Sequence, residues 1–252
     1  MQPRLSRLGA AVAAALFLAA PRASADTITL QFTGTTNGNA VTYSLNGNGE
    51  AGIPGPYFWQ TVPGGTPVAT FCMDLSVGIP PSAVTFNVGG LTDLPGVTQA
   101  KADAITALYG NNYKTAWGSQ ATASGEAGYG SFQLALWELL YDGEFDLAHP
   151  GTNWFANGSF QSSDSAAVGA GAMLDAILNS SGGVAAGEAN FASNFPGQEL
   201  IGLVSPGVQG QIVLPPPGVI GVPAPPGVLL AGVGLVVLAG RARWLRRTAT
   251  TA

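Results

Sequence analysis

One cysteine stands out in this chain of 252 residues, because no second cysteine is present to form a disulfide with it. Cys72 lies in an alternating, β-branched run that predicts a strand over 68–75. On such a strand Cys72 and Asp74 point to the same face. A lone thiol is a buried apolar group, a bridge to another chain or a reactive nucleophile, so Cys72 needs an explanation.

A single amide forms the second anomaly, in an otherwise apolar helix predicted over 129–141. At 100° per residue, Gln133 shares a face with Trp137, Leu140 and Tyr141. A buried amide without a hydrogen-bond partner costs about 1–3 kcal/mol. We therefore expect Gln133 to have a definite partner.

One reaction accounts for both anomalies. A cysteine thiolate can attack a glutamine carboxamide and expel ammonia, which leaves an internal thioester between Cys72 and Gln133. This reaction needs a positioned nucleophile and a site that excludes water. In the other interpretation, Cys72 packs as a small apolar residue and Gln133 binds main-chain groups at a strand end. Both interpretations remain open at this point.

The two segments resemble the motifs of a known family, the TQXA-type thioester domains of bacterial surface adhesins. Those domains carry Cys-Ile-Asp on a strand and Gln-x-Ala-Ile-Trp on a helix. This chain has Cys-Met-Asp at 72–74 and Gln-Leu-Ala-Leu-Trp at 133–137, in the same order and 61 residues apart. The departures from the family pattern are Met73 and Leu136 in place of Ile, and Phe132 in place of Thr.

The resemblance implies a role for each matching residue. It makes Cys72 and Gln133 the thioester partners, with Ala135 and Trp137 packing around them. Asp74 matches the first motif without an assigned role. A thioester of this kind is used once, so the resemblance implies covalent attachment to an amine or hydroxyl of a partner rather than enzymatic turnover. We therefore expect no catalytic residue, metal or cofactor.

The charges are divided between the ends and the body of the chain. Seven of the nine basic residues lie in the first 22 or the last 12 positions, and all 14 acidic residues lie between Asp26 and Glu199. The stretch 26–240 holds two lysines against those 14 acids, a formal charge of −12. In the whole chain, only 9% of the residues are charged. The low charge content and the acidic body both argue against nucleic acid as a partner.

The first 25 residues have the pattern of a secretory signal peptide. Arg4 and Arg7 precede an uncharged, Ala- and Leu-rich run, and Ala23-Ser24-Ala25 offers a small-residue cleavage site. We therefore predict export.

The last 30 residues resemble the PEP-CTERM sorting signal of exported bacterial proteins. A Pro-rich motif, a short apolar run and an Arg-rich tail follow one another, with Ala224 where the family has Glu. The apolar run 227–240 would make a helix of about 21 Å, short for a hydrocarbon core of about 30 Å. The matching positions are Val222, Pro223, Pro225, Pro226, Arg241, Arg243, Arg246 and Arg247.

The sorting resemblance implies an exosortase-like processing protease as a partner. It also implies transient anchoring through the stretch 227–247, a C-terminal membrane helix followed by an Arg-rich tail that stays cytoplasmic. Release to the cell surface or to an exopolysaccharide matrix would follow.

The body, 26–213, is predicted to have an α+β fold, with a Pro/Gly linker over 214–226. Its β-rich half is expected to be an antiparallel sheet or sandwich, with a helical segment inserted at about 97–180. Strands are predicted at 27–33, 40–45, 83–88 and 209–214, and further helices at 97–109 and 165–178. We expect turns at 46–47 and 48–49, a loop over 50–67 and a linker at 182–187.

Two weaker patterns accompany these. Tyr57, Phe58 and Trp59 form either buried anchors or an exposed patch for stacking on sugars. Asp142, Glu144 and Asp146 alternate like the start of a calcium loop, but Leu147 and Asn153 stand where its Gly and Glu should be, so we expect a solvated turn.

The sequence thus predicts an exported surface or matrix protein that attaches covalently through a Cys72–Gln133 thioester. Its partner would be a surface polysaccharide or another amine-bearing molecule. The alternative is a non-covalent structural or carbohydrate-binding matrix protein, in which Cys72 and Gln133 only pack.

Overall fold

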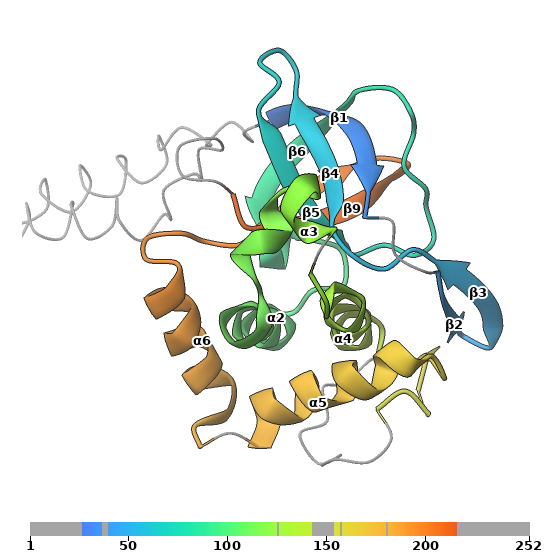
Figure 1. Cartoon of the computed structure of the whole chain (residues 1–252), viewed down its shortest axis with the longest axis vertical. Coiled ribbons are helices and arrows are strands. Elements are labelled where there is room, and N and C mark those ends of the chain that lie inside the picture. Colours follow the sequence, from blue (N-terminus) through green and yellow to red (C-terminus); the bar gives the residue numbers. More distant parts are fainter. Residues whose placement is uncertain are drawn as a thin grey trace, which may run out of the picture.

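A closed antiparallel barrel forms the β-rich half of the molecule in a computed structural model, which describes residues 27–215 except 37–39, 125, 143–153, 157 and 180 (Figure 1). The fold is α+β, as predicted, but the β half is a barrel rather than a sandwich. In spatial order, its strands are β1 (Thr27–Thr35), β4 (Tyr57–Thr61), β5 (Pro67–Cys72), β9 (Val208–Val213), β8 (Ile201–Ser205) and β6 (Val84–Gly90).

The barrel forms because its strands alternate apolar and polar residues. In β6, Val84, Phe86 and Val88 are buried while Thr85 and Asn87 are exposed. One set of buried strand residues, which includes Leu30, Trp59 and Phe86, forms the apolar cluster of the barrel, whereas Phe58, Phe71 and Ile212 belong to the core shared with the helices. The strands predicted at 27–33, 83–88 and 209–214 are confirmed, and β9 closes the barrel between β5 and β8. The strand β8 was not predicted.

The loop predicted over 50–67 is wrong, because β4 lies inside it. This strand fits between Pro56 and Pro63, so no proline interrupts its ladder. Phe58 and Trp59 are buried, and the Trp59 indole donates a hydrogen bond to Thr70 Oγ1 at 3.0 Å. Of the two possibilities for this aromatic trio, buried anchors are therefore correct.

A second, smaller sheet contains β3 (Asn48–Gly52), β2 (Val41–Leu45) and β7 (Phe160–Gln161). The β2–β3 turn is made by Asn46 and Gly47, both with positive φ, which is typical of a two-residue hairpin. The prediction of another turn at 48–49 is wrong, because the hairpin is complete at Gly47 and β3 starts immediately.

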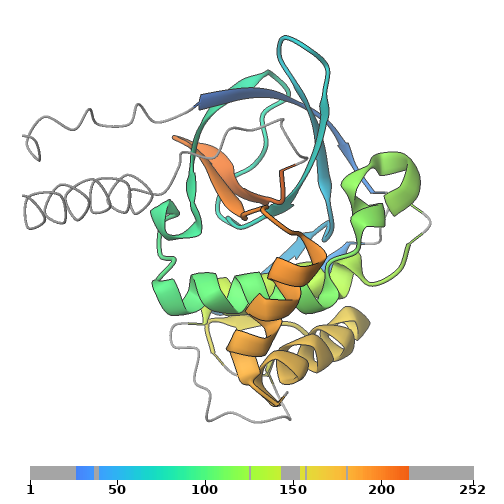
Figure 2. The same ribbon diagram turned by 90° about the vertical axis from the view of Figure 1, so that its left-hand side faces the viewer.

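Four longer helices gather at one end of the barrel (Figures 1 and 2). They are α2 (Gln99–Asn112), α4 (Tyr129–Tyr141), α5 (Ser165–Asn179) and α6 (Gly183–Asn194). Helices were predicted for the first three, but the expected inward position of Val168 in α5 is wrong, since this side chain is 79% exposed. Leu174 and Ile177 are buried, as predicted, and Met173 is partly buried.

The linker predicted at 182–187 is also wrong, because it begins α6. Its glycines serve a close helix crossing: a Cβ added at Gly110 of α2 would lie 2.2 Å from the carbonyl oxygen of Gly187. Gly187 in turn has the side chain of Ala107 against it. Small residues therefore allow α2 and α6 to pack backbone to backbone.

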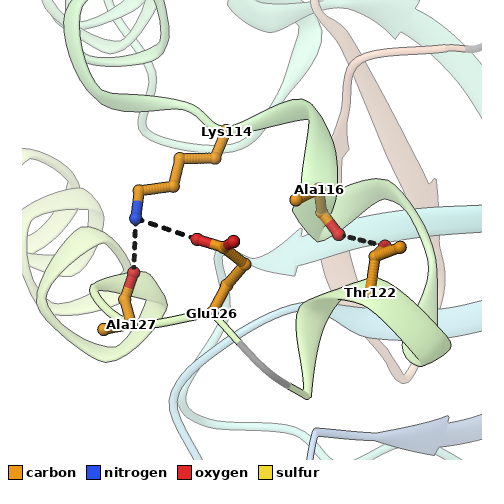
Figure 3. Close-up of polar contacts among 5 residues, drawn as sticks. All are labelled: Lys114, Ala116, Thr122, Glu126 and Ala127. Carbon is orange, nitrogen blue, oxygen red and sulfur yellow. Dashed lines mark hydrogen bonds and ion pairs between the residues drawn. The ribbon is translucent and has the colours of Figure 1, made fainter.

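The connection from α2 to α4 contains η2 (Thr115–Gly118) and α3 (Gln120–Ala123). Figure 3 shows Lys114 bridging the Glu126 carboxylate and the Ala127 carbonyl, each at 3.1 Å, and Thr122 donating to the Ala116 carbonyl. Another short helix, η1 (Leu91–Asp93), follows β6. The contacts of Lys114 and Thr122 link η2 and α3 to the residues that lead into α4.

The predicted signal peptide, the sorting motif and the C-terminal helix lie outside the described residues. Within the ranges that the structure describes, no helix is long and apolar enough to cross a membrane.

Candidate functional site

Cys72 lies where one side of its strand loses its neighbour. It is the last residue of β5, whose pairing with β4 extends only to Thr70. Pairing with β9 continues to Cys72, opposite Gln211. The next amide, that of Met73, bonds to Gly210 of β9, so the amide and carbonyl of Cys72 both face the other side, where β4 has ended, and need a partner there.

Gln133 supplies that partner. Its Oε1 accepts a hydrogen bond from the Cys72 amide at 3.1 Å, and its Nε2 donates to the Cys72 carbonyl at 2.7 Å. Both residues are fully buried. The carboxamide thus continues the ladder in place of β4, and Gln133 has the definite partner that the sequence led us to expect.

The rest of the predicted helix face contacts the same segment. The Trp137 indole donates to the Cys72 carbonyl at 3.1 Å, and the Tyr141 hydroxyl accepts from the Leu75 amide at 2.7 Å. Ala135 is fully buried in the core between barrel and helices. Phe132, the departure from the family motif, packs at a tilt against Phe71 with ring centroids 4.8 Å apart.

The thiol itself is protonated at neutral pH. Burial raises the pKa of Cys72 to about 12. The Sγ donates to the Asp74 carbonyl oxygen at 3.4 Å. Attack by this sulfur therefore requires removal of the thiol proton.

Asp74 lies beyond the strand, because β5 ends at Cys72 and not at residue 75 as predicted. Its carboxylate accepts from the amide and the hydroxyl of Ser76, at 2.8 and 2.6 Å. It is the Asp74 carbonyl that meets the thiol. The same carbonyl accepts a hydrogen bond from the side-chain Nε2 of Gln209 at 2.8 Å, so Asp74 contributes to the site through its main chain.

A buried polar chain beside Cys72 was not foreseen. Thr70 Oγ1 donates to Gln211 Oε1 at 2.7 Å, and Gln211 Nε2 donates to Gln209 Oε1 at 3.1 Å. Every member is buried. Gln209 and Gln211 are two residues apart on β9 and so lie on the same face of the strand. This spacing was the signal in the sequence that could have revealed the chain.

A second unforeseen feature is a buried carboxyl group on α4. Burial, together with the smaller effect of nearby Asp142, raises the pKa of Glu138 to about 10, so Glu138 is neutral at pH 7. Lys101 reaches the end of the same helix, where it donates to the Leu140 carbonyl at 2.5 Å. A single charged residue within an apolar helix was the sequence signal.

The calcium-like pattern finds no support in the part of the chain that is described. Asp142 Oδ1 accepts from the amides of Ser159 and Phe160, at 2.6 and 3.1 Å, so it caps main-chain groups. Glu144, Asp146, Leu147 and Asn153 lie outside the described residues. Across the described ranges, no group of three or more His, Cys, Asp or Glu side chains is arranged to hold a metal ion.

Comparison of the chain with protein-family models, with curated proteins and with solved structures finds no match.

Proposed function

We propose that this protein is an exported surface or matrix protein that attaches covalently to a partner through an internal thioester between Cys72 and Gln133. The observation that carries the proposal is the double hydrogen bond between the Gln133 carboxamide and the Cys72 main chain. These bonds hold the Gln133 carboxamide, whose carbon is the electrophile, against the main chain of Cys72, the residue that carries the nucleophilic thiol. Effective concentration of this kind lowers the barrier to bond formation.

The reaction balances without a co-reactant. The Cys72 sulfur bonds to Cδ of Gln133, the bond from Cδ to Nε2 breaks, and the thiol proton leaves with the nitrogen as ammonia. A partner amine later attacks the thioester carbon, which forms an amide at Gln133 and returns the thiol. The full burial of both residues supports the proposal, since it keeps water from hydrolysing the thioester.

The same two hydrogen bonds also suit the alternative, a non-covalent matrix protein. Gln133 would then be a clamp that satisfies the end of β5, and the unreactive, protonated thiol would be a small core residue. The covalent function requires the loss of ammonia from the folded protein and the alternative does not, so the mass of the protein decides between them.

The test is the intact mass of the purified protein under denaturing, mildly acidic conditions. The thioester predicts a mass one ammonia below that of the sequence in the wild type. Cys72→Ala and Gln133→Glu should each have the full mass of their sequences. A wild-type protein with its full sequence mass and a thiol that alkylates once unfolded would remove the covalent function and leave the matrix protein.

Export and sorting form a separate part of the proposal, supported by the basic ends and the Pro-rich motif of the sequence. Deletion of 222–252 should abolish retention in the membrane before release. If the truncated protein fractionates like the full chain, the sorting part is wrong, whatever the mass experiment gives.

A further inference from the structure

An open cleft of about 720 Å³ includes Tyr43 in its lining, and Tyr43 packs against Trp137, which contacts Cys72. One wall comes from β2 and the residues around β7, and the other from α5. Figure 1 shows α5 beneath α2 and α4, with one end directed toward the β2–β3 sheet. This volume is in the range of ligand-binding clefts.

An aromatic platform stands in this cleft. Trp154 is partly buried, and its Nε1 donates to Asp175 Oδ1 at 3.0 Å, which fixes the plane of the indole. Gly171 of α5 lies against its edge, where an added Cβ would be 3.5 Å from Cδ1. A fixed indole beside a carboxylate offers a sugar ring both an apolar face and a hydrogen-bond acceptor.

Polar side chains also line the cleft. Ser162 donates to the Thr42 carbonyl at 2.8 Å, and exposed Gln161 donates to the Gly158 carbonyl at 3.2 Å. The exposed hydroxyl of Ser163 adds another group that can both donate and accept. Hydroxyl and amide groups at this density suit a ligand rich in hydroxyls rather than an apolar one.

Charge selects among such ligands. Asp175 is the only charged residue among the described residues that line the cleft, and the stretch 26–240 carries −12. Acidic polysaccharides are therefore repelled, and a cationic sugar is attracted. We propose that this cleft binds a polysaccharide of amino sugars, with a ring stacked on Trp154 and an ammonium group near Asp175.

The cleft is also close to the proposed thioester. Tyr43 lines the cleft and packs on Trp137 with ring centroids 5.4 Å apart, and Trp137 donates to the Cys72 carbonyl. A bound amino sugar would bring a primary amine, the nucleophile class that opens a thioester. Only this capture step rests on the proposed function; the binding itself does not.

The test uses the full chain carrying Cys72→Ala, so that only reversible binding is measured. Calorimetric titrations compare hexamers of glucosamine, N-acetylglucosamine and glucose. We expect the glucosamine hexamer to bind most tightly, with an affinity that falls as salt rises. Adding Trp154→Ala should weaken its binding by about tenfold or more.

The charge variants complete the test. Asp175→Asn should remove the preference for glucosamine, whereas Glu199→Gln should not, since it makes the same charge change at an exposed position outside the cleft. Trp154→Phe, which keeps an aromatic face without the indole N–H, should bind more tightly than Trp154→Ala. This variant protects the result against a general loss of folding.

Each outcome has a definite meaning. Absence of binding to all three hexamers at low salt, or equal effects of Asp175→Asn and Glu199→Gln, overturns the cleft proposal. Reversible binding to Cys72→Ala without any covalent product from the wild type overturns the capture step and leaves the cleft, while the intact mass of the wild type tests the thioester itself. If Trp154→Ala in a chain that keeps Cys72 forms the covalent product as well as the wild type does, the cleft proposal is overturned and the thioester remains.

Discussion

Replacing Cys72 with Ala should cost far more stability than the loss of a small buried side chain. The proposed bond joins residues 61 positions apart and so closes a long loop. The chain-entropy treatment of cross-links gives about 4 kcal/mol for a loop of this length. Loss of a buried sulfur alone compares with small core truncations, at about 0.5–1.5 kcal/mol.

Denaturant unfolding followed by tryptophan fluorescence measures this difference. Trp117, Trp59 and Trp137 are all buried, so unfolding changes their environment. We expect Cys72→Ala to lose about 4.5–5.5 kcal/mol in the free energy of unfolding. In a domain of this size, each kcal/mol corresponds to a fall of about 2–4 °C in Tm.

A chemical control separates the bond from the side chain. Wild-type protein treated with methylamine keeps Cys72 but loses the cross-link, so it should unfold close to Cys72→Ala. A loss of less than about 1.5 kcal/mol in Cys72→Ala, together with no effect of methylamine on the wild type, would refute the reasoning.

Three further predictions concern the surrounding structure. The pKa of Glu138 rises from its usual 4.5 to about 10 on folding, so the unfolded chain loses this proton first, and wild-type stability should fall as pH rises between these values. Glu138→Gln should remove that fall, which is up to about 1.4 kcal/mol per pH unit in matched unfolding titrations. Parallel stability profiles of the two proteins would refute the neutral carboxyl. Gly110→Ala should destabilise by about 1–3 kcal/mol through the clash with Gly187, whereas Gly96→Ala has open space and costs only its backbone strain; equal thermal shifts would contradict the close crossing. Lys114→Ala should cost at most about 1 kcal/mol, because its ion pair with Glu126 is exposed, and a larger loss in denaturant unfolding would show that the α2–α4 connection depends on it.

The sequence allowed part of this site to be predicted, because two residues were out of place. Gln133 is an amide in an apolar helix and Cys72 is an unpaired thiol, and the cost of burying the amide required a partner. The sequence did not show that the partner atoms are the main-chain groups of Cys72. That detail depends on where β4 stops pairing with β5, which is a matter of tertiary register.

The errors in the fold have physical causes as well. Glycine is common in linkers and equally at close helix contacts, so Gly187 in isolation could not reveal α6. The prolines of 50–67 hid β4, because a strand of five residues fits between them. Barrel closure requires β8 and β9 to pair with strands far away in the sequence, and such pairing leaves no local pattern.

The central claim, that a bond joins Cys72 to Gln133, is tested most directly by tryptic digestion. Lys101 and Lys114 are the only tryptic sites between residues 26 and 240. Cleavage at both places Cys72 and Gln133 on different peptides, and the lone cysteine excludes an internal disulfide between them. Under mildly acidic denaturing conditions, we predict that the peptide ending at Lys101 and the peptide starting at Thr115 remain joined, one ammonia lighter than their sum. Two separate peptides with their full sequence masses would contradict the thioester.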